Sequence, residues 1–189
     1  MTIDVTWEWL GMGPALDLAN TVTLDDGEEE DLLAPPGEYE RWARAEAAAL
    51  GWSGERGELL RTEGKRVRRL RAPVRAVVGA VADGRPLPPD AVAALNRASR
   101  RAPRWTELDP RSGELHTHHR GGPLAALLAE YARDALRVAA PSEGPLRRCP
   151  APACGMVYPP QRPQQRWCSV QCGTRARVAR HYRRHRVRH

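Results

Sequence analysis

The sequence of 189 residues contains no phenylalanine and only one lysine, Lys65. Leucine, valine, alanine and tryptophan must therefore form any core, and arginine must carry nearly all of the positive charge. No segment is long and apolar enough to cross a membrane, so we expect no membrane-spanning helix. The first residues, MTIDVTWEW, have no basic region and no apolar run, so we expect no signal peptide and a cytoplasmic location.

Sequence motifs of common catalytic sites are also missing. The chain has no HExxH motif, no nucleophile elbow and no phosphate-binding glycine loop with a lysine. We therefore expect a protein that is not an enzyme.

Acidic residues are missing from the last part of the chain. Residues 145–189 have 11 basic and no acidic side chains, whereas residues 1–60 have 3 basic and 14 acidic ones. The overall net charge of +7 therefore conceals an acidic front and a strongly basic end. This basic end favours a polyanionic partner, and a merely solubilising charge is the alternative.

All four cysteines lie between residues 149 and 172, in the pattern C-x4-C-x13-C-x3-C. Two close pairs separated by a short span are typical of a four-thiolate zinc site, because each pair supplies two adjacent corners of a tetrahedron. We predict one structural Zn²⁺ bound by Cys149, Cys154, Cys168 and Cys172. Four cysteines leave no open position for water, so the zinc is not expected to be catalytic. Two disulfides are the alternative, and they require an oxidising compartment.

The residues around the cysteines predict a treble-clef-like finger. We expect a strand at Met156–Tyr158, a return strand at Arg166–Trp167, and a helix that begins after Cys168 with Ser169 as its cap. Cys172 then lies in the first turn of this helix, where the positive end of the helix favours a thiolate. Because only residues after Pro145 depend on the metal, we expect the rest of the chain to stay folded without it.

Seven arginines and three histidines follow Cys172 in the segment GTRARVARHYRRHRVRH. A polycationic helix attached rigidly to a zinc site suits phosphate groups, and a disordered basic tail is the alternative. We predict nucleic-acid contacts by nine residues: Arg166, Arg175, Arg177, Arg180, His181, Arg183, Arg184, Arg186 and Arg188.

The segment from Arg166 to His185 resembles the CGNR zinc finger. Cys172, Gly173 and Arg175 match the motif that gives this finger its name, while Thr174 replaces its asparagine. Tyr158 matches an aromatic position of the family, and Pro159 replaces the acidic residue that tends to follow it. The resemblance implies a bacterial transcription regulator.

The front of the chain resembles the ABATE domain, which precedes this finger in bacterial proteins described as stress-induced transcription regulators. The resemblance rests on the sequence ALDLANTV at residues 15–22, on DLL near Asp31, and on Trp42. Together the two resemblances cover nearly the whole chain.

Residues 1–140 are predicted to form a mostly helical body with a few antiparallel strands, and residues 145–189 form the finger, giving an α+β fold. Hydrophobic patterns predict a strand at Val5–Leu10 and helices at 15–23, 35–50, 55–82, 90–100 and 123–138. Gly64 and Pro73 should bend or break the long helical region, and Asp90 should cap the helix that follows. The residues 105–108 and 114–117 predict a β-hairpin, and the acidic segment 24–34 predicts a loop.

Asn20, Thr21 and Trp42 are candidate walls of a ligand pocket in the body, because polar residues interrupt an apolar run there. The alternative is that Asn20 bonds to backbone and serves the structure alone. The body is expected to sense a small-molecule effector or to form a homodimer.

The sequence thus predicts a cytoplasmic, zinc-dependent regulator that binds double-stranded DNA. An RNA-binding or ribosome-associated zinc protein is one alternative, because its electrostatics would be the same. A protein-interaction adaptor with a purely structural finger is the other.

Overall fold

The computed structural model describes residues 10–25 and 28–186, with only the backbone of residues 184–186. In chain order its elements are α1 (Pro14–Ala19), β1 (Val22–Asp25), β2 (Glu28–Asp31), α2 (Glu38–Ala49), α3 (Gly54–Thr62), α4 (Gly64–Ala82), α5 (Pro89–Arg100), β3 (Arg104–Leu108), β4 (Leu115–His119), α6 (Pro123–Val138), the short 3-10 helix η1 (Pro141–Glu143), β5 (Arg147–Arg148), β6 (Val157–Tyr158) and α7 (Val170–Arg186). The α+β class is confirmed, since six helices and two hairpins precede the finger in the described chain. The predicted strand Val5–Leu10 lies outside the described residues except for Leu10.

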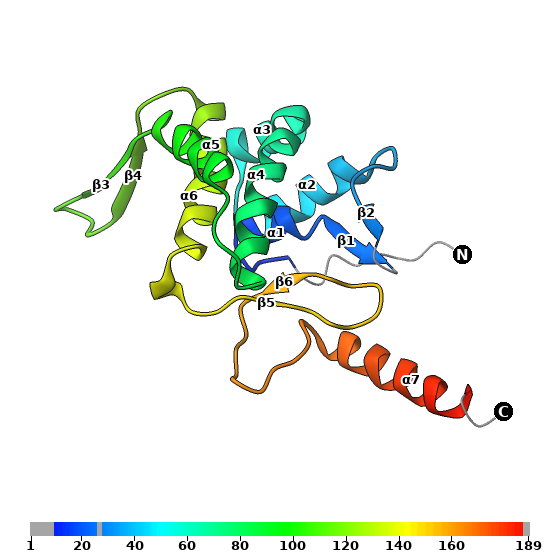
Figure 1. The fold of residues 1–189 in the computed structure, drawn as a ribbon. Coiled ribbons are helices and arrows are strands. Elements are labelled where there is room, and N and C mark those ends of the chain that lie inside the picture. Colours follow the sequence, from blue (N-terminus) through cyan, green and yellow to red (C-terminus); the bar gives the residue numbers. More distant parts are fainter. Residues whose placement is uncertain (1–9, 26–27, 187–189) are drawn as a thin grey trace.

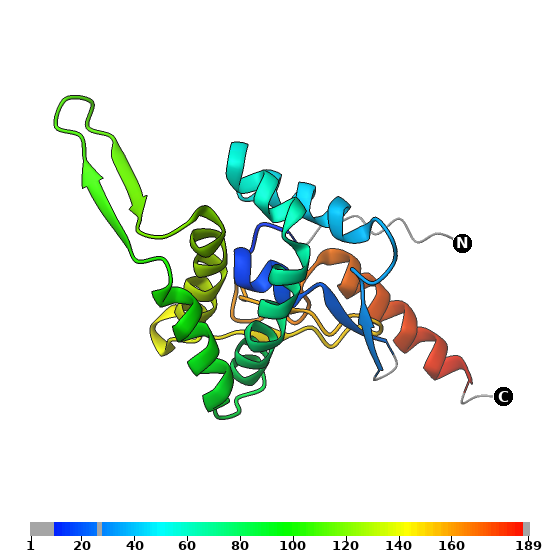
Figure 2. The same ribbon diagram turned by 90° about the horizontal axis from the view of Figure 1, so that it is seen from above.

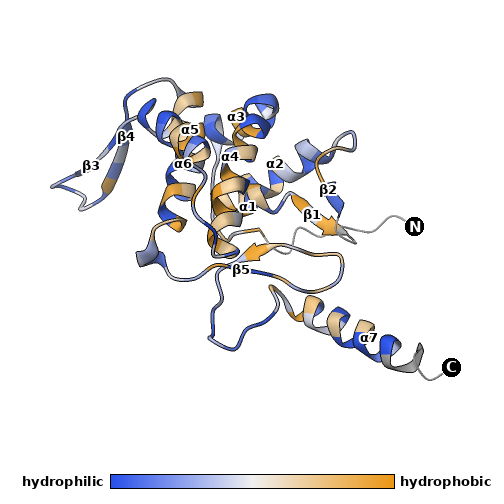
Figure 3. Cartoon of the chain, in the orientation of Figure 1, coloured by the Kyte–Doolittle hydropathy of each residue, from blue (hydrophilic) through white to orange (hydrophobic). Residues whose placement is uncertain are grey.

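The core lies between α1, α4 and α6, with α5 on the outer side (Figure 1). Stretches of hydrophobic residues occur along α1, α4 and α6, where they alternate with hydrophilic ones (Figure 3). Val74, Val77 and Leu127 are fully buried there, and Trp42 and Tyr131 are the largest buried side chains. Because phenylalanine is absent, small aliphatic side chains and these two aromatic rings fill the interior.

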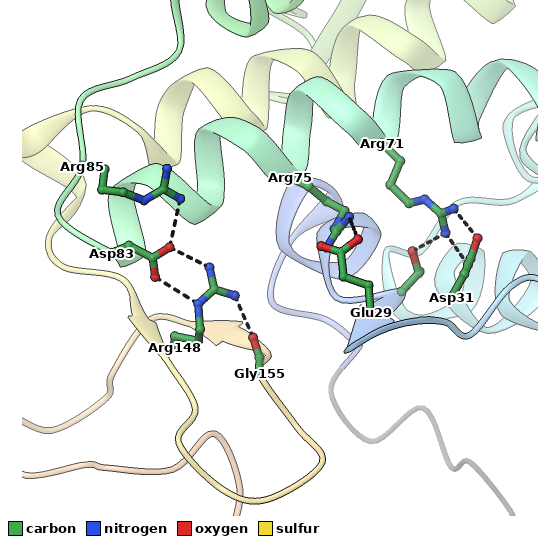
Figure 4. Close-up of polar contacts among 9 residues, drawn as sticks. Glu29, Asp31, Arg71, Arg75, Asp83, Arg85, Arg148 and Gly155 are labelled. Atoms are coloured by element: carbon green, nitrogen blue, oxygen red, sulfur yellow. Dashed lines mark hydrogen bonds and ion pairs between the residues drawn. The ribbon is translucent and has the colours of Figure 1, made fainter. Parts of the chain in front are cut away.

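The predicted helix at 15–23 is wrong at its end, because α1 stops at Ala19 and the chain enters a β-hairpin. β1 and β2 pair antiparallel with Val22 opposite Asp31, so the acidic segment that predicted a loop is a strand. The strand is held by ion pairs with α4: Arg71 contacts Asp31, and Arg75 contacts Glu29 (Figure 4). These distant cations outweigh the low strand propensity of the acidic residues.

The long helical region breaks at Glu63, between α3 and α4, and α4 continues through Pro73. The sequence predicted a bend or break at both Gly64 and Pro73; the helices break next to Gly64, whereas Pro73 does not break α4. Val67 and Val74 are both fully buried, so α4 is packed on the core on each side of Pro73. Gly64 is needed for another reason, because an added Cβ would lie 2.7 Å from the Tyr39 ring.

The helices α5 and α6 and the hairpin β3–β4 occur where the sequence predicts them. Asp90 is not the cap of α5, however, since Pro88 holds that position and Asp90 lies in the first turn. The hairpin and α7 project from opposite ends of the molecule (Figures 1 and 2). The finger therefore presents its basic helix far from the hairpin.

The finger shares the core of the body. Leu146 and Val157, on either side of the first cysteine pair, are buried in the same apolar cluster as Leu16 and Val78. The expectation that only residues after Pro145 depend on the metal stays a prediction, and this shared core gives a reason to test it.

Candidate metal centre and its basic helix

The first cysteine pair lies on a turn between two short strands. β5 and β6 pair antiparallel, with Arg147 opposite Tyr158, and the turn between them carries Cys149 and Cys154. The Cys149 N–H donates to the Met156 carbonyl at 2.8 Å and closes this turn. The strand predicted at Met156–Tyr158 is confirmed at Val157–Tyr158.

The predicted return strand Arg166–Trp167 is wrong, because β5 occupies the pairing edge of β6. The intervening loop contains Pro159, Pro160 and Pro163, which have no N–H to donate to a strand ladder. Side chains hold this loop instead: Arg147 Nη1 donates to the Gln165 carbonyl at 2.7 Å.

The second cysteine pair brackets the start of α7. The Ser169 hydroxyl accepts the Cys172 N–H at 3.1 Å, so the predicted cap is confirmed. Gly173 follows, and an added Cβ at this position would come within 3.3 Å of the Trp167 ring. The glycine thus lets the first turn of α7 lie directly on Trp167.

The four sulfur atoms have the geometry of a tetrahedral zinc site. Zn–S bonds of about 2.3 Å place neighbouring sulfurs about 3.8 Å apart in a tetrahedron. In the structure, Cys154 Sγ lies 3.7 Å from Cys168 Sγ and from Cys172 Sγ, and the latter two sulfurs lie 3.5 Å apart. All four ligand atoms lie within 4.8 Å of one another, and only Cys168 is partly exposed. The donor set therefore fits one Zn²⁺, and the alternative of two disulfides is not what the geometry shows.

The four thiols lie close enough together to shift one another's pKa values. Hydrogen bonds from Cys154 and Cys168 lower the pKa of Cys149 to about 2, and the hydrogen bond with Cys149 raises the pKa of Cys154 to about 12. When Zn²⁺ is bound it supplies the positive charge that lets all four sulfurs be thiolates.

One arginine contacts the metal ligands directly. Arg175 Nη2 lies 3.0 Å from Cys172 Sγ, so it donates to a thiolate from the next turn of α7. Such outer-shell donors orient ligands and offset the excess negative charge of a four-thiolate site.

The finger is bonded to the body at three places. Asn20 bonds both backbone groups of Val157, and the Leu24 N–H donates to the Cys154 carbonyl at 3.2 Å. Arg148 bridges Asp83 at the end of α4 and the Gly155 carbonyl of the finger (Figure 4). No sequence pattern links Asp83 to Arg148, so these tethers were not predicted.

The three predicted pocket residues have separate structural roles. Asn20 is buried against Val157, while the Thr21 hydroxyl donates to the Leu18 carbonyl at 2.8 Å. Trp42 is fully buried in the core and stacks at a tilt on Tyr39. Since both polar ends of the Asn20 amide are occupied by backbone, the arrangement matches the structural interpretation rather than a pocket wall.

Of the nine residues predicted to contact nucleic acid, Arg175 contacts Cys172, and the other eight fall into three groups. Arg166 lies over the Trp167 ring, and Arg177 donates to the Thr174 hydroxyl at 2.9 Å. Arg180, His181 and Arg183 are exposed on α7. The side chains of Arg184 and Arg186, and the whole of Arg188, lie outside the described residues. Apart from Arg166, all of the predicted nucleic-acid-binding residues whose side chains the structure describes therefore lie on α7.

Among the described residues, no helix combines the length and the hydrophobicity that crossing a bilayer requires. Comparison of the whole chain with curated proteins finds no significant match. The CGNR zinc finger family matches residues 146–185. The ABATE family, described as "Putative stress-induced transcription regulator", matches residues 13–141. The chain therefore belongs to the ABATE family and carries a CGNR zinc finger with a site for one structural zinc ion.

Proposed function

We propose that this protein is a zinc-dependent, DNA-binding transcription regulator in which α7 contacts the phosphates of duplex DNA. The observation that carries the proposal is the composition of α7, whose described part has four exposed arginines and no acidic residue: Arg175, Arg177, Arg180 and Arg183. Each phosphate contact by such a group releases condensed counterions, which makes binding favourable at physiological salt.

The arginines of α4, in the body, are less suited to bind nucleic acid than those of α7. Arg71 and Arg75 on α4 form ion pairs with Asp31 and Glu29 of the acidic hairpin, so their charge is neutralised within the molecule. Acidic residues of the β1–β2 hairpin are thus paired with arginines of α4.

The zinc site supports a metal-dependent function. Cys168 and Cys172 bracket the first turn of α7, so the ion fixes the direction in which the arginine helix leaves the finger. The description of the ABATE family supports a regulatory rather than an enzymatic role. We assign all four thiols to metal binding and none to catalysis.

The test is fluorescence anisotropy with a random-sequence duplex at about 50 mM and about 200 mM salt, using the zinc-loaded protein. Changing Arg177, Arg180 and Arg183 together to alanine should weaken binding and reduce the salt slope by about 0.9 per lost phosphate contact. The matched control changes Arg97, Arg100 and Arg101, which are exposed at the end of α5, and should leave binding unchanged.

Two outcomes assign a different function. If structured RNA displaces the duplex at lower concentration than unlabelled DNA does, the protein binds RNA. If the α7 triple variant binds as the wild type does, α7 is not the nucleic-acid surface, and an adaptor role takes its place.

A further inference from the structure

The side of α7 that faces away from the finger is apolar, although the helix is the most basic part of the chain. Val170, Thr174, Val178 and Tyr182 are spaced four apart and follow one another along this side. Val170 is 84% exposed, Val178 49% and Tyr182 68%. The buried positions Cys172 and Gly173 lie on the opposite side, against the metal centre and Trp167.

This row also lines a depression that is open to solvent. Its lining consists of Val170, Thr174 and Val178 of the row together with Gln171, Arg175 and Ala179. Figures 1 and 2 show α7 projecting away from the helical body, so no element of the described body covers this part of the helix. Exposed apolar surface of this kind on a helix marks an interaction site.

Arginines flank the apolar row on both sides. By the period of 3.6 residues per turn, Arg177 and Arg180 lie to one side of the row and Arg175 to the other. The helix thus presents an apolar centre between two positive margins. The major groove of B-DNA has the complementary arrangement, since phosphates border it on both sides and its floor displays base edges, including the thymine methyl group.

We propose that α7 lies in the major groove with the row Val170, Thr174 and Val178 against the bases, so that these side chains select thymine while the arginines hold the phosphates. The inference rests on the proposed function and identifies the part of α7 that selects sequence. The simpler hypothesis is that the arginines near the zinc site select the base sequence. We do not adopt it, because Arg175 already contacts Cys172 Sγ and Arg177 contacts the Thr174 hydroxyl.

Other occupants fit this surface less well. An A-form RNA duplex has a major groove too deep and narrow for a helix to enter. A second copy docking through the same row would bring two arginine-lined helices together, and α7 has no acidic residue to offset their repulsion.

The experiment begins with selection of bound duplexes from a random-sequence library by the zinc-loaded full chain. Thymines of the selected duplex are then replaced one at a time by deoxyuracil, which pairs identically but lacks the methyl group. A thymine in contact with the row should give about a 4-fold loss of affinity when its methyl is removed, as expected for one buried methyl.

Val178→Ala and Val170→Ala should abolish this difference between thymine and uracil duplexes. Both positions are exposed and alanine is a better helix former than valine, so the variants keep the fold. Arg183→Ala is the matched control: it should weaken both duplexes equally and leave their ratio unchanged.

Three outcomes overturn the inference. If the protein binds duplexes in a salt-dependent way but no uracil substitution matters, the row does not contact thymine, and the proposed DNA-binding function stands without it. If the protein binds no duplex at any salt concentration, both proposals are wrong. If the wild type is a dimer that Val178→Lys dissociates, and uracil has no effect, the row is an interface between two copies.

Discussion

The side-chain amide of Asn20 completes the hydrogen bonding of Val157, a residue 137 positions away in the finger. Asn20 Nδ2 donates to the Val157 carbonyl at 2.9 Å, and Asn20 Oδ1 accepts the Val157 N–H at 2.8 Å. Val157 lies between the metal ligands Cys154 and Cys168, and it is buried in the core of the body. One side chain at the end of α1 therefore joins the body to the metal-bound finger.

Replacing Asn20 by alanine should destabilise the whole protein by about 2–4 kcal/mol, because two buried backbone groups of Val157 lose their partners. Urea denaturation followed by tryptophan fluorescence measures this change. Asn96→Ala on α5 is the control and should shift the free energy of unfolding by less than about 0.5 kcal/mol. Equal effects of the two substitutions would show that the Asn20 amide does not hold the finger.

Removing the metal should destabilise the body as well as the finger. Cys172→Ser should loosen the segment that carries Val157 and Leu146, and both residues are part of the body core. Each kcal/mol lost corresponds to about 2–4 °C in the thermal midpoint of a chain of this size. Hydrogen exchange of the α1 and α4 amides measures the effect directly. Unchanged protection of these amides in the metal-free protein would mean that the body folds independently.

Elements that depend on neighbouring residues could be predicted from the sequence. The hairpin β3–β4 follows from a turn containing Pro110 and Gly113 between two strand-like runs, and α6 follows from its apolar spacing after Gly122 and Pro123. The metal centre was predictable for the same reason, because thiol pairs at short spacing carry their chemistry in the local sequence.

Elements that depend on distant partners could not be predicted. The acidic strand β2 exists because Arg71 and Arg75, at least 40 residues away, pair with it. The strand β5 has only two residues, so it has no periodicity to detect. The buried Asn20 was visible as a polar residue in an apolar run, but nothing local indicated that its partner would be Val157.

Two buried carboxyl groups, Glu46 and Asp17, lie close together in the core of the body. Burial and the nearby Asp17 raise the pKa of Glu46 to about 9, while burial raises the pKa of Asp17 to about 6. Asp17 accepts the N–H groups of Gly11 and Met12, and Tyr131 donates to Glu46 Oε1 at 3.1 Å. We therefore expect Glu46 to hold a proton at neutral pH in the folded protein.

This proton predicts a pH dependence of stability. Between the ordinary glutamate pKa of 4.5 and about 9, folded Glu46 holds a proton that the unfolded chain has lost. The Glu46 proton stabilises the folded protein fully below pH 4.5. This stabilisation is lost as the pH rises toward 9, and the free energy of unfolding falls by at most about 1.4 kcal/mol per pH unit. Glu46→Gln should flatten this decline, because the amide is neutral at every pH.

Urea midpoints at about pH 5.5, 7 and 8.5 measure the decline that this linkage predicts. The control Glu40→Gln changes a carboxylate on the same helix that is 54% exposed, and its profile should run parallel to that of the wild type. Parallel profiles for wild type and Glu46→Gln would contradict the assignment of the proton to Glu46.

Arg71 should matter for stability and not for nucleic-acid binding. Its guanidinium contacts both oxygens of Asp31 and the Thr21 hydroxyl, and only 14% of its side chain is exposed. Arg71→Ala should cost about 1–3 kcal/mol, because Asp31 loses a partly buried partner. Denaturation and duplex binding measured on one preparation test both statements, with the exposed Arg69→Ala as control. A lower salt slope for Arg71→Ala would place α4 on the nucleic acid instead.

Arg175 should support the metal as well as border the nucleic-acid surface of α7, because its guanidinium lies 3.0 Å from Cys172 Sγ. A donor at this distance stabilises the thiolate, and removing such an outer-shell partner typically lowers metal affinity about 10–100-fold. We therefore expect Arg175→Ala to release zinc to a competing chelator at about 10–100-fold lower chelator excess than the wild type. Arg177, two residues further along α7, bonds to Thr174 instead, so Arg177→Ala should leave zinc affinity unchanged. Arg175→Lys should restore part of the affinity, since an ammonium group supplies the charge but not the planar fork. If Arg175→Ala keeps its zinc and loses affinity for duplex DNA alone, the arginine reaches the nucleic acid, and the contact with Cys172 is not what determines its role.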